Sequence, residues 1–402
     1  MRVLRKLCGV TFCFCLCLFL SSCATTNISN INKTSNFQFI DGEESLWKRA
    51  HELKVVLNRS GFIYQDPELT KYVNGVLHRL VGEFAKDEKV NLKVYILRDP
   101  YFNAFCLPDG TIYIHTSILA NLDNEAQLAV ILAHEAVHFL HRHTLKELRS
   151  VINKTAFLSV LQITLAGACN VFTPGASGSS VDLVRLISEY AVLGSYYGYS
   201  RGIEREADKG AFDIITHAGY DPRETKNALE NMYEANKDEK VKIPYFYQSH
   251  PRTRERIKNF ERFISDLAKS GKSPLTGETN TETYRQMTKC ALLDNAELDM
   301  KRNSLRLARN EIDKYNKLYP DDYKGYYLLG KLNYLDSKAE DAEENLVKSL
   351  QLNPDCSDSH RELGMLYYKQ GKKEQAKAKF TKYLELKPQA TDAEYIRSYL
   401  NE

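Results

Sequence analysis

The chain has 402 residues, of which 43% are hydrophobic, and it carries 55 lysines and arginines against 52 aspartates and glutamates. Three of the basic residues lie within positions 1–22, so the rest of the chain holds 52 residues of each sign. This balance excludes the basic surface that is typical of nucleic-acid-binding proteins, and we expect no nucleic-acid partner.

Residues 1–22 have the pattern of a signal peptide. A basic start is followed by the apolar run Val10–Leu20, which is too short for an ordinary membrane span. The run ends in Leu20-Ser21-Ser22-Cys23, which resembles the signal box of bacterial lipoproteins and predicts acylation of the Cys23 sulfur. A plain signal peptide with an incidental cysteine is the alternative. Because Ala24 follows, resemblance to Gram-negative sorting implies an anchor in the outer membrane, facing the periplasm.

Four cysteines remain beyond Cys23, and none forms a C-x-x-C pair: Cys106, Cys169, Cys290 and Cys356. An exported protein can form disulfides, but the spacing leaves the pairing open. Cys106 lies near the expected site. We expect it to be a small buried hydrophobe, with a reactive thiolate as the alternative.

A polar tether and two strands precede the chemical motifs. Residues 23–40, rich in asparagine, threonine and serine, predict an extended tether. Residues 91–97 alternate as a strand, and residues 111–115 form a second. The segment 103–114 is expected to border a cleft, where an edge strand can hold a peptide backbone by strand addition. The candidate substrate-binding residues are Asn103, Ala104 and Phe105.

An H-E-x-x-H motif lies within the apolar segment Glu125–Leu140. Residues four apart share a helix face, so His134 and His138 can direct their rings at one metal ion while Glu135 acts on a neighbouring water. The alternative is an ordinary helix with two partly buried histidines and a salt-bridged glutamate. Against it, a charged Glu135 in so apolar a run costs several kcal/mol unless it is paired or metal-linked.

A second apolar stretch, residues 156–171, follows the motif. It is shorter than an ordinary membrane span and includes Gln162, Gly167 and Asn170. We therefore expect a buried helix or a lid, with a membrane-contacting segment as the alternative.

A third ligand must come from elsewhere, because a catalytic zinc takes three protein ligands. Glu204 and Asp208 are separated by one helical turn and share a helix face. One can bind the metal while the other hydrogen-bonds a ligand histidine. An ordinary solvated run of charges is the alternative interpretation.

The C-terminal part of the chain repeats. Residues 269–283 are polar and interrupted by glycine and proline, which predicts a linker. Beyond it Pro320, Pro354 and Pro388 recur at a constant interval, which equals the period of tetratricopeptide repeats. This period favours a repeat solenoid over a generic helical bundle, with residues 390–400 as a capping helix.

Four blocks along the chain, taken together, resemble the HtpX/CAAX-prenyl-protease type of zinc metallopeptidase, a branch of the zincins. The matching residues are Asp66-Pro67-Glu68-Leu69, Tyr72-Val73-Asn74, Asn103-Ala104-Phe105, Pro108-Asp109-Gly110-Thr111-Ile112-Tyr113-Ile114, Asn124-Glu125-Ala126-Gln127-Leu128-Ala129, His134-Glu135, His138, His143, Glu204 to Asp208, Ser249-His250-Pro251 and Arg256-Ile257. The order of a peptidase followed by repeats resembles the β-barrel assembly-enhancing proteases (BepA).

The resemblance implies one zinc ion per chain, held by His134, His138 and Glu204, with Asp208 supporting a ligand. It also implies an α+β, mainly α, fold: a zincin-like metallopeptidase domain with a small β-sheet, followed by an α-helical tetratricopeptide solenoid. The predicted organisation is a signal peptide over 1–22, a tether over 23–40, a peptidase domain over 41–268, a linker over 269–283 and repeats with a capping helix over 284–402.

The expected function is a lipid-anchored periplasmic zinc endopeptidase that acts in protein quality control. Glu135 would be the general base. His250 would lie near the metal, either helping the oxyanion or occupying the open zinc position at rest, and Arg256 would anchor its loop. The expected partners are unfolded or misassembled proteins, outer-membrane assembly machinery at the repeats, and the membrane through the lipid.

A function of another class is also consistent with this sequence. The repeats could form a scaffold or chaperone that binds a client, with the peptidase domain latent. The presence of every expected zinc residue argues against a dead enzyme, but not against one that is mostly closed. Metal content measured together with cleavage of an unfolded protein separates the two functions.

Overall fold

A computed structural model describes residues 28–31, 37–83, 90–150, 199–236, 253–271 and 275–400. The predictions for the signal peptide, Cys23, the apolar stretch 156–171 and His250 therefore lie outside the described residues. Within those residues the chain is mostly helical and contains one small sheet. The predicted fold class, mainly helical α+β, is confirmed.

The sheet has three strands: β1 (Lys93–Leu97), β2 (Ala104–Cys106) and β3 (Thr111–His115). Its order is β1-β3-β2, with β1 parallel and β2 antiparallel to β3. Successive side chains along a strand face opposite sides. Phe105 and Tyr113 accordingly pair across the two strands on one face, where their rings stack with centroids 5.2 Å apart.

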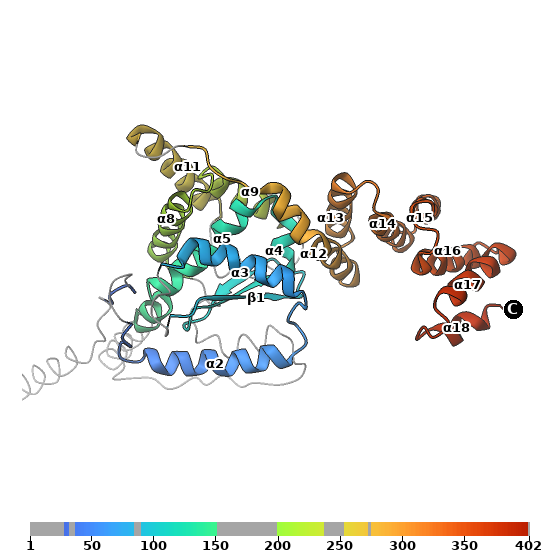
Figure 1. Cartoon of the computed structure of the whole chain (residues 1–402), viewed down its shortest axis with the longest axis horizontal. Coiled ribbons are helices and arrows are strands. Elements are labelled where there is room, and N and C mark those ends of the chain that lie inside the picture. The colour runs from blue at the N-terminus through green and yellow to red at the C-terminus, as the bar shows by residue number, and fades with distance from the viewer. Residues whose placement is uncertain are drawn as a thin grey trace, which may run out of the picture.

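Helices cover both faces of this sheet (Figure 1). α2 (Glu43–Arg59) packs on the face that carries Phe105, while α3 (Pro67–Val81) and α5 (Glu125–Leu140) pack on the other. Every residue of α5 is buried. The helix begins as its sequence predicts, because the side chain of Asn124 accepts a hydrogen bond from a backbone N–H of the first turn.

The remaining helices of this half pack on α5 or on its neighbours. They are α4 (Thr116–Asn121), α8 (Arg201–His217), α9 (Glu224–Asn236) and α11 (Thr253–Ser270). Among the described helices, none combines the length and the apolar character that crossing a membrane requires. The H-E-x-x-H helix is thus the central element around which the other parts of this half are arranged.

The predicted linker is partly docked on the half of the chain that contains α5. Its first residues complete α11, and residues 275–280 run beside the turn that follows α8, where Tyr220 and Glu278 form a parallel bridge. The carbonyl oxygen of Thr279 accepts hydrogen bonds from the N–H groups of Glu125 and Ala126. These N–H groups belong to the first turn of α5, where N–H groups have no hydrogen-bond partner within their own helix. The segment therefore completes the start of the H-E-x-x-H helix.

The region predicted to form repeats begins near α12 (Thr281–Lys301), which packs against α4. Successive helices then extend away as an arm (Figure 1). They are α13 (Leu305–Leu318), α14 (Tyr323–Leu335), α15 (Ala339–Leu352), α16 (Ser357–Lys369), α17 (Lys373–Leu386) and α18 (Ala393–Ser398). A Cβ atom added at Gly364 on α16 would lie 2.5 Å from the Phe380 ring of α17, so glycine is what allows this helix pair to approach closely.

Candidate metal centre

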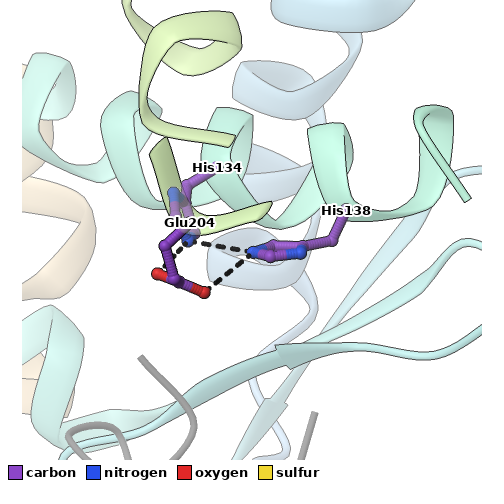
Figure 2. A group of neighbouring side chains, drawn as sticks. All are labelled: His134, His138 and Glu204. Carbon is purple, nitrogen blue, oxygen red and sulfur yellow. Dashed lines mark hydrogen bonds and ion pairs between the residues drawn. The ribbon is translucent and has the colours of Figure 1, made fainter. Parts of the chain in front are cut away.

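The two predicted metal-binding segments meet where α8 packs against α5. The helices approach closely because α8 carries Gly210 at the contact: a Cβ atom there would lie 2.9 Å from Cγ2 of Val137. α5 holds His134 and His138 one turn apart, and α8 brings Glu204 to the same point from a distant part of the sequence (Figure 2).

The ligand atoms of these three side chains lie close together. His134 Nε2 and His138 Nε2 are 3.1 Å apart. The carboxylate oxygens of Glu204 lie 3.7 Å from His134 Nε2 and 3.6 Å from His138 Nε2. Both imidazole edges and the carboxylate face a common centre (Figure 2).

These distances fit a tetrahedral metal ion. Zinc binds imidazole nitrogen and carboxylate oxygen at about 2.0–2.2 Å, which places neighbouring tetrahedral ligands about 3.3 Å apart. The three separations, from 3.1 to 3.7 Å, scatter around this value. Two nitrogens and one oxygen are also the donor set of catalytic zinc sites, which keep the fourth position open. The residues present therefore fit the metal that the sequence implies.

Asp208 and Arg256 form an ion pair behind His134. The guanidinium of Arg256 donates to the carboxylate through Nε at 3.1 Å and through Nη2 at 2.7 Å. Burial alone would raise the pKa of Asp208, but the charge of Arg256 outweighs it and lowers this pKa to about 2. The ionised Asp208 Oδ1 lies 3.2 Å from His134 Nδ1. A hydrogen on Nδ1 directs the lone pair of Nε2 toward the ligand group.

The charges buried around the ligand group favour a divalent cation. Glu135, Glu204 and Asp208 are each at most 4% exposed, and so is the guanidinium-bearing Arg256. Arg256 balances one carboxylate, and its Nη1 lies 3.6 Å from Glu204. An uncompensated buried charge is costly. A divalent cation between the histidines would balance the charges of the other two carboxylates.

Glu135 follows His134 on α5 and is 1% exposed. Its charge acts on the β2 side of the site: burial, followed by the charge of Glu135, raises the pKa of the Cys106 thiol well above its ordinary value. Cys106 is therefore a buried neutral thiol, in agreement with its expected role as a small hydrophobe. Cys106, Cys290 and Cys356, the cysteines that the structure describes, are all free.

Tyr199 holds the ring of His138 from one side. The two rings stack at 4.0 Å between centroids with an interplanar angle of 17°. The Tyr199 hydroxyl shares a hydrogen bond with Thr144 Oγ1 at 3.0 Å, and burial raises its pKa well above the ordinary value. The tyrosine therefore stays neutral and limits rotation of His138. Sequence reasoning missed it, because an isolated tyrosine carries no signal of stacking.

A second polar group lies beyond His138. His143 Nδ1 is 3.0 Å from His138 Nδ1, and His143 Nε2 is 3.6 Å from Glu206 Oε2. His141 Nδ1 binds the other oxygen of Glu206 at 2.5 Å. Burial lowers the pKa of His143 to about 3. Glu206 is the middle acid of the Glu204–Asp208 motif, and sequence reasoning assigned no role to it.

The predicted substrate residues lie where the sheet ends. Within the described part of the chain β2 has a strand partner on one side, β3, so its other edge borders no strand. Ala104 and Phe105 are buried, and Phe105 packs toward α2. Their side chains therefore belong to the core. The carbonyl oxygen of Asn103 accepts a hydrogen bond from the N–H of His115 in β3, so strand addition at the other edge would use backbone groups that face away from β3, such as those of Ala104.

Comparison with known proteins gives two family matches. Residues 67–264 match peptidase family M48, and residues 337–401 match a tetratricopeptide repeat family. The mitochondrial metalloendopeptidase OMA1 of Schizosaccharomyces pombe is 31% identical over 198 residues, which cover 49% of this chain and 53% of that protein.

Bacterial relatives match the same region. The putative β-barrel assembly-enhancing protease of Vibrio cholerae is 27% identical over 202 residues, covering 48% of this chain and 39% of that protein. The β-barrel assembly-enhancing protease of Escherichia coli is 26% identical over 179 residues, covering 44% of this chain and 35% of that protein. The chain thus spans about half the length, or less, of the curated relatives it matches.

Proposed function

Because residues 67–264 form a domain of peptidase family M48 and tetratricopeptide repeats follow it, we propose that this protein is a zinc-dependent endopeptidase. One zinc ion per chain is held by His134, His138 and Glu204. The observation that carries the proposal is the meeting of two imidazole nitrogens and a carboxylate oxygen at tetrahedral separations, beside the carboxylate of Glu135.

Each buried residue has a separate task in peptide hydrolysis. His134, His138 and Glu204 would hold a zinc ion, which would supply Lewis-acid chemistry toward the scissile carbonyl and a neighbouring water. Glu135 accepts a proton from the attacking water and returns it to the leaving amine nitrogen. Asp208 orients His134, and Arg256 keeps Asp208 ionised. His250 acts near the metal, as an oxyanion donor or as a gate at rest.

We further propose that the substrates are unfolded or misassembled proteins at the periplasmic face of the outer membrane, where the Cys23 lipid holds the protein. The bacterial relatives are named β-barrel assembly-enhancing proteases, which supports this setting. The repeats supply a surface for a client or for assembly machinery. A groove of about 570 Å³ runs along α12, α14 and α16, and Tyr315, Tyr327 and Leu328 are among its lining residues.

A second candidate function is a scaffold or chaperone with a latent peptidase. The near-complete burial of the three ligand side chains, which are 2–4% exposed, favours this alternative. A closed site of this kind would bind metal without cleaving protein until a client or a partner opened it.

The two functions separate in one experiment on the full chain. We expect one zinc per chain and chelator-sensitive cleavage of an unfolded protein such as reduced casein. Glu135→Gln should retain zinc and lose turnover, because the ligands remain and only the base is removed. Glu230→Gln, an exposed change on α9, is the matched control and should cleave normally. Full activity of Glu135→Gln would overturn the mechanism, and zinc without cleavage in the wild type would favour the latent scaffold.

A further inference from the structure

The hydrogen-bond chain behind His138 has a direction that zinc binding dictates. A neutral imidazole carries one hydrogen, so a histidine that binds metal through Nε2 must carry its hydrogen on Nδ1. His138 Nδ1 lies 3.0 Å from His143 Nδ1. His138 can therefore donate only if His143 accepts at Nδ1, and His143 must then carry its own hydrogen on Nε2. Glu206 Oε2 lies 3.6 Å from that nitrogen, an electrostatic contact that is longer than a hydrogen bond.

From this arrangement we propose that His143 and Glu206 are positioning residues, which fix the tautomer and orientation of His138 for metal binding. The inference rests on the proposed metal site and extends it. Asp208 fixes the tautomer and orientation of His134 directly. For His138 the corresponding partner is another histidine, because Nδ1 of His138 faces Nδ1 of His143.

The fold holds this pair in place by two separate devices. Arg142, immediately before His143, has a φ of 52°, in the left-handed region that non-glycine residues seldom adopt. Its guanidinium is fixed by Glu43 Oε1 at 2.8 Å and by two backbone carbonyl groups. The turn reverses the chain after α5 and returns His143 against His138. A non-glycine residue kept in this conformation by several contacts is a feature of functional sites.

The second device is α8, which carries a residue that faces the ligand histidines and another that faces His143. Glu204 and Glu206 lie close together on this helix, and one faces the ligand histidines while the other faces His143 and His141. A single rigid element thus positions both the third ligand and the carboxylate that faces His143 Nε2. A shift of α8 would alter both at once.

The group His141, His143 and Glu206 also resembles a second metal site, but its geometry favours hydrogen bonding. His141 Nδ1 and Glu206 Oε1 are 2.5 Å apart, well below the separation of about 3.3 Å between ligands of one metal ion. A metal on His143 Nε2 would also place the hydrogen of His143 on Nδ1, where it would meet the hydrogen of His138 Nδ1.

The test measures metal affinity of the full chain, by competition with a chelator for cobalt(II) and zinc at fixed pH. His143→Ala should weaken binding about 10–100-fold, the usual effect of removing such a partner. His143→Asn should recover most of this loss, because its side-chain oxygen lies near the former Nδ1 and accepts from His138. A purely structural role would leave the two variants alike. Glu206→Ala should weaken binding less than His143→Ala.

Two further measurements complete the test. Nitrogen-15 NMR of the zinc-loaded protein should show hydrogen on Nδ1 of His138 and on Nε2 of His143. His141→Ala should still bind one zinc, and loss of a second zinc equivalent in that variant would instead establish a second metal site and overturn the proposal. Wild-type binding matched by His143→Ala would refute the positioning role and leave the proposed function standing, whereas a wild type without metal would refute the proposed function itself.

Discussion

At the scale of single residues, the partner of a buried group decides what that group can do. The three carboxylates near the ligand histidines are equally buried, yet each has a different neighbour: Asp208 has a guanidinium, Glu204 has both ligand histidines, and Glu135 lies toward Cys106. The ion pair keeps Asp208 charged and therefore available to His134. Burial alone would have raised the pKa of Asp208 instead of lowering it.

Asp208→Asn tests this reasoning. The amide lacks the charge that pairs with Arg256, and it holds the hydrogen on His134 Nδ1 less firmly. We expect metal affinity to fall about 10–100-fold, measured by chelator competition. Asp213→Asn is the matched control, since Asp213 lies on the same helix but is exposed and paired with Lys209. Equal affinity of Asp208→Asn and wild type would show that Asp208 does not support the metal.

A second buried carboxyl, Glu311 on α13, leads to a pH-dependent prediction. Its Oε1 accepts a hydrogen bond from Asn295. Burial, followed by the charge of Asp299, raises the pKa of Glu311 well above its ordinary value. The folded chain therefore keeps a proton that the unfolded chain loses above about pH 4. The contribution of this proton to the free energy of unfolding is fully present below about pH 4. It declines as the pH rises from there toward the pKa of Glu311 in the folded chain.

Glu311→Gln removes this decline, because the amide is neutral at every pH. We expect the variant to melt at a higher temperature than wild type near pH 7.5, with the difference shrinking toward pH 4.5. Circular dichroism melting curves across this range make the comparison. Glu340→Gln, an exposed change on α15, should follow the wild type throughout. A Glu311→Gln advantage that stays constant with pH would contradict the assignment.

At the scale of elements, the spacing between α5 and α8 sets the geometry of the ligand group. Neither helix carries all three ligands, so their separation determines whether Glu204 reaches the two histidines. Gly210 permits that separation, because a side chain there would meet Val137. Protein interiors are close-packed and transmit such shifts.

Gly210→Ala should therefore reduce metal affinity, although alanine favours a helix by about 1 kcal/mol over glycine. Adding Val137→Ala to this variant should restore affinity, since it removes the side chain that the new Cβ atom meets. Gly202→Ala lies on the same helix with open space around it and should change stability without changing affinity. If Gly210→Ala bound metal as tightly as Gly202→Ala, the helix contact would not control the site.

At the scale of the whole molecule, the repeats and the peptidase half share an interface. The Tyr284 hydroxyl of α12 donates to the Leu119 carbonyl of α4, and Lys314 of α13 donates to the carbonyls of Ala120 and Leu122. The docked segment 275–280 reaches the start of α5. Tyr284 and Ala291 of α12 thus belong to the hydrophobic cluster that includes α5, while α16 and α17 belong to a separate hydrophobic cluster.

Metal removal should distinguish these two regions. Chelation leaves buried carboxylates uncompensated and removes the stabilisation that a bound ligand confers on the folded state. We expect hydrogen exchange to speed up in α5 and α8 and to remain unchanged in α16 and α17, measured by mass spectrometry with and without chelator. Restoring zinc should restore protection. Uniform change along the chain, or none, would contradict a metal-stabilised peptidase half.

Sequence alone determined the features that depend on short-range order. The i, i+4 spacing places His134 and His138 on one helix face wherever that helix lies, and the constant proline period specifies repeated helix pairs by itself. The family matches confirm the metallopeptidase and repeat predictions. The assignments of Cys23 and His250 stay predictions, because both residues lie outside the described structure.

Tertiary structure decided everything that joins distant segments. It brought Glu204 to the histidines, directed Phe105 into the core, docked the predicted linker on α5, and placed Glu206 against His143. No local pattern contains these relations, because they depend on how closely two helices pack and on which groups burial leaves in need of a hydrogen-bond partner. The sequence alone identifies the metal-binding residues, whereas the folded chain determines which hydrogen-bond partners orient their rings.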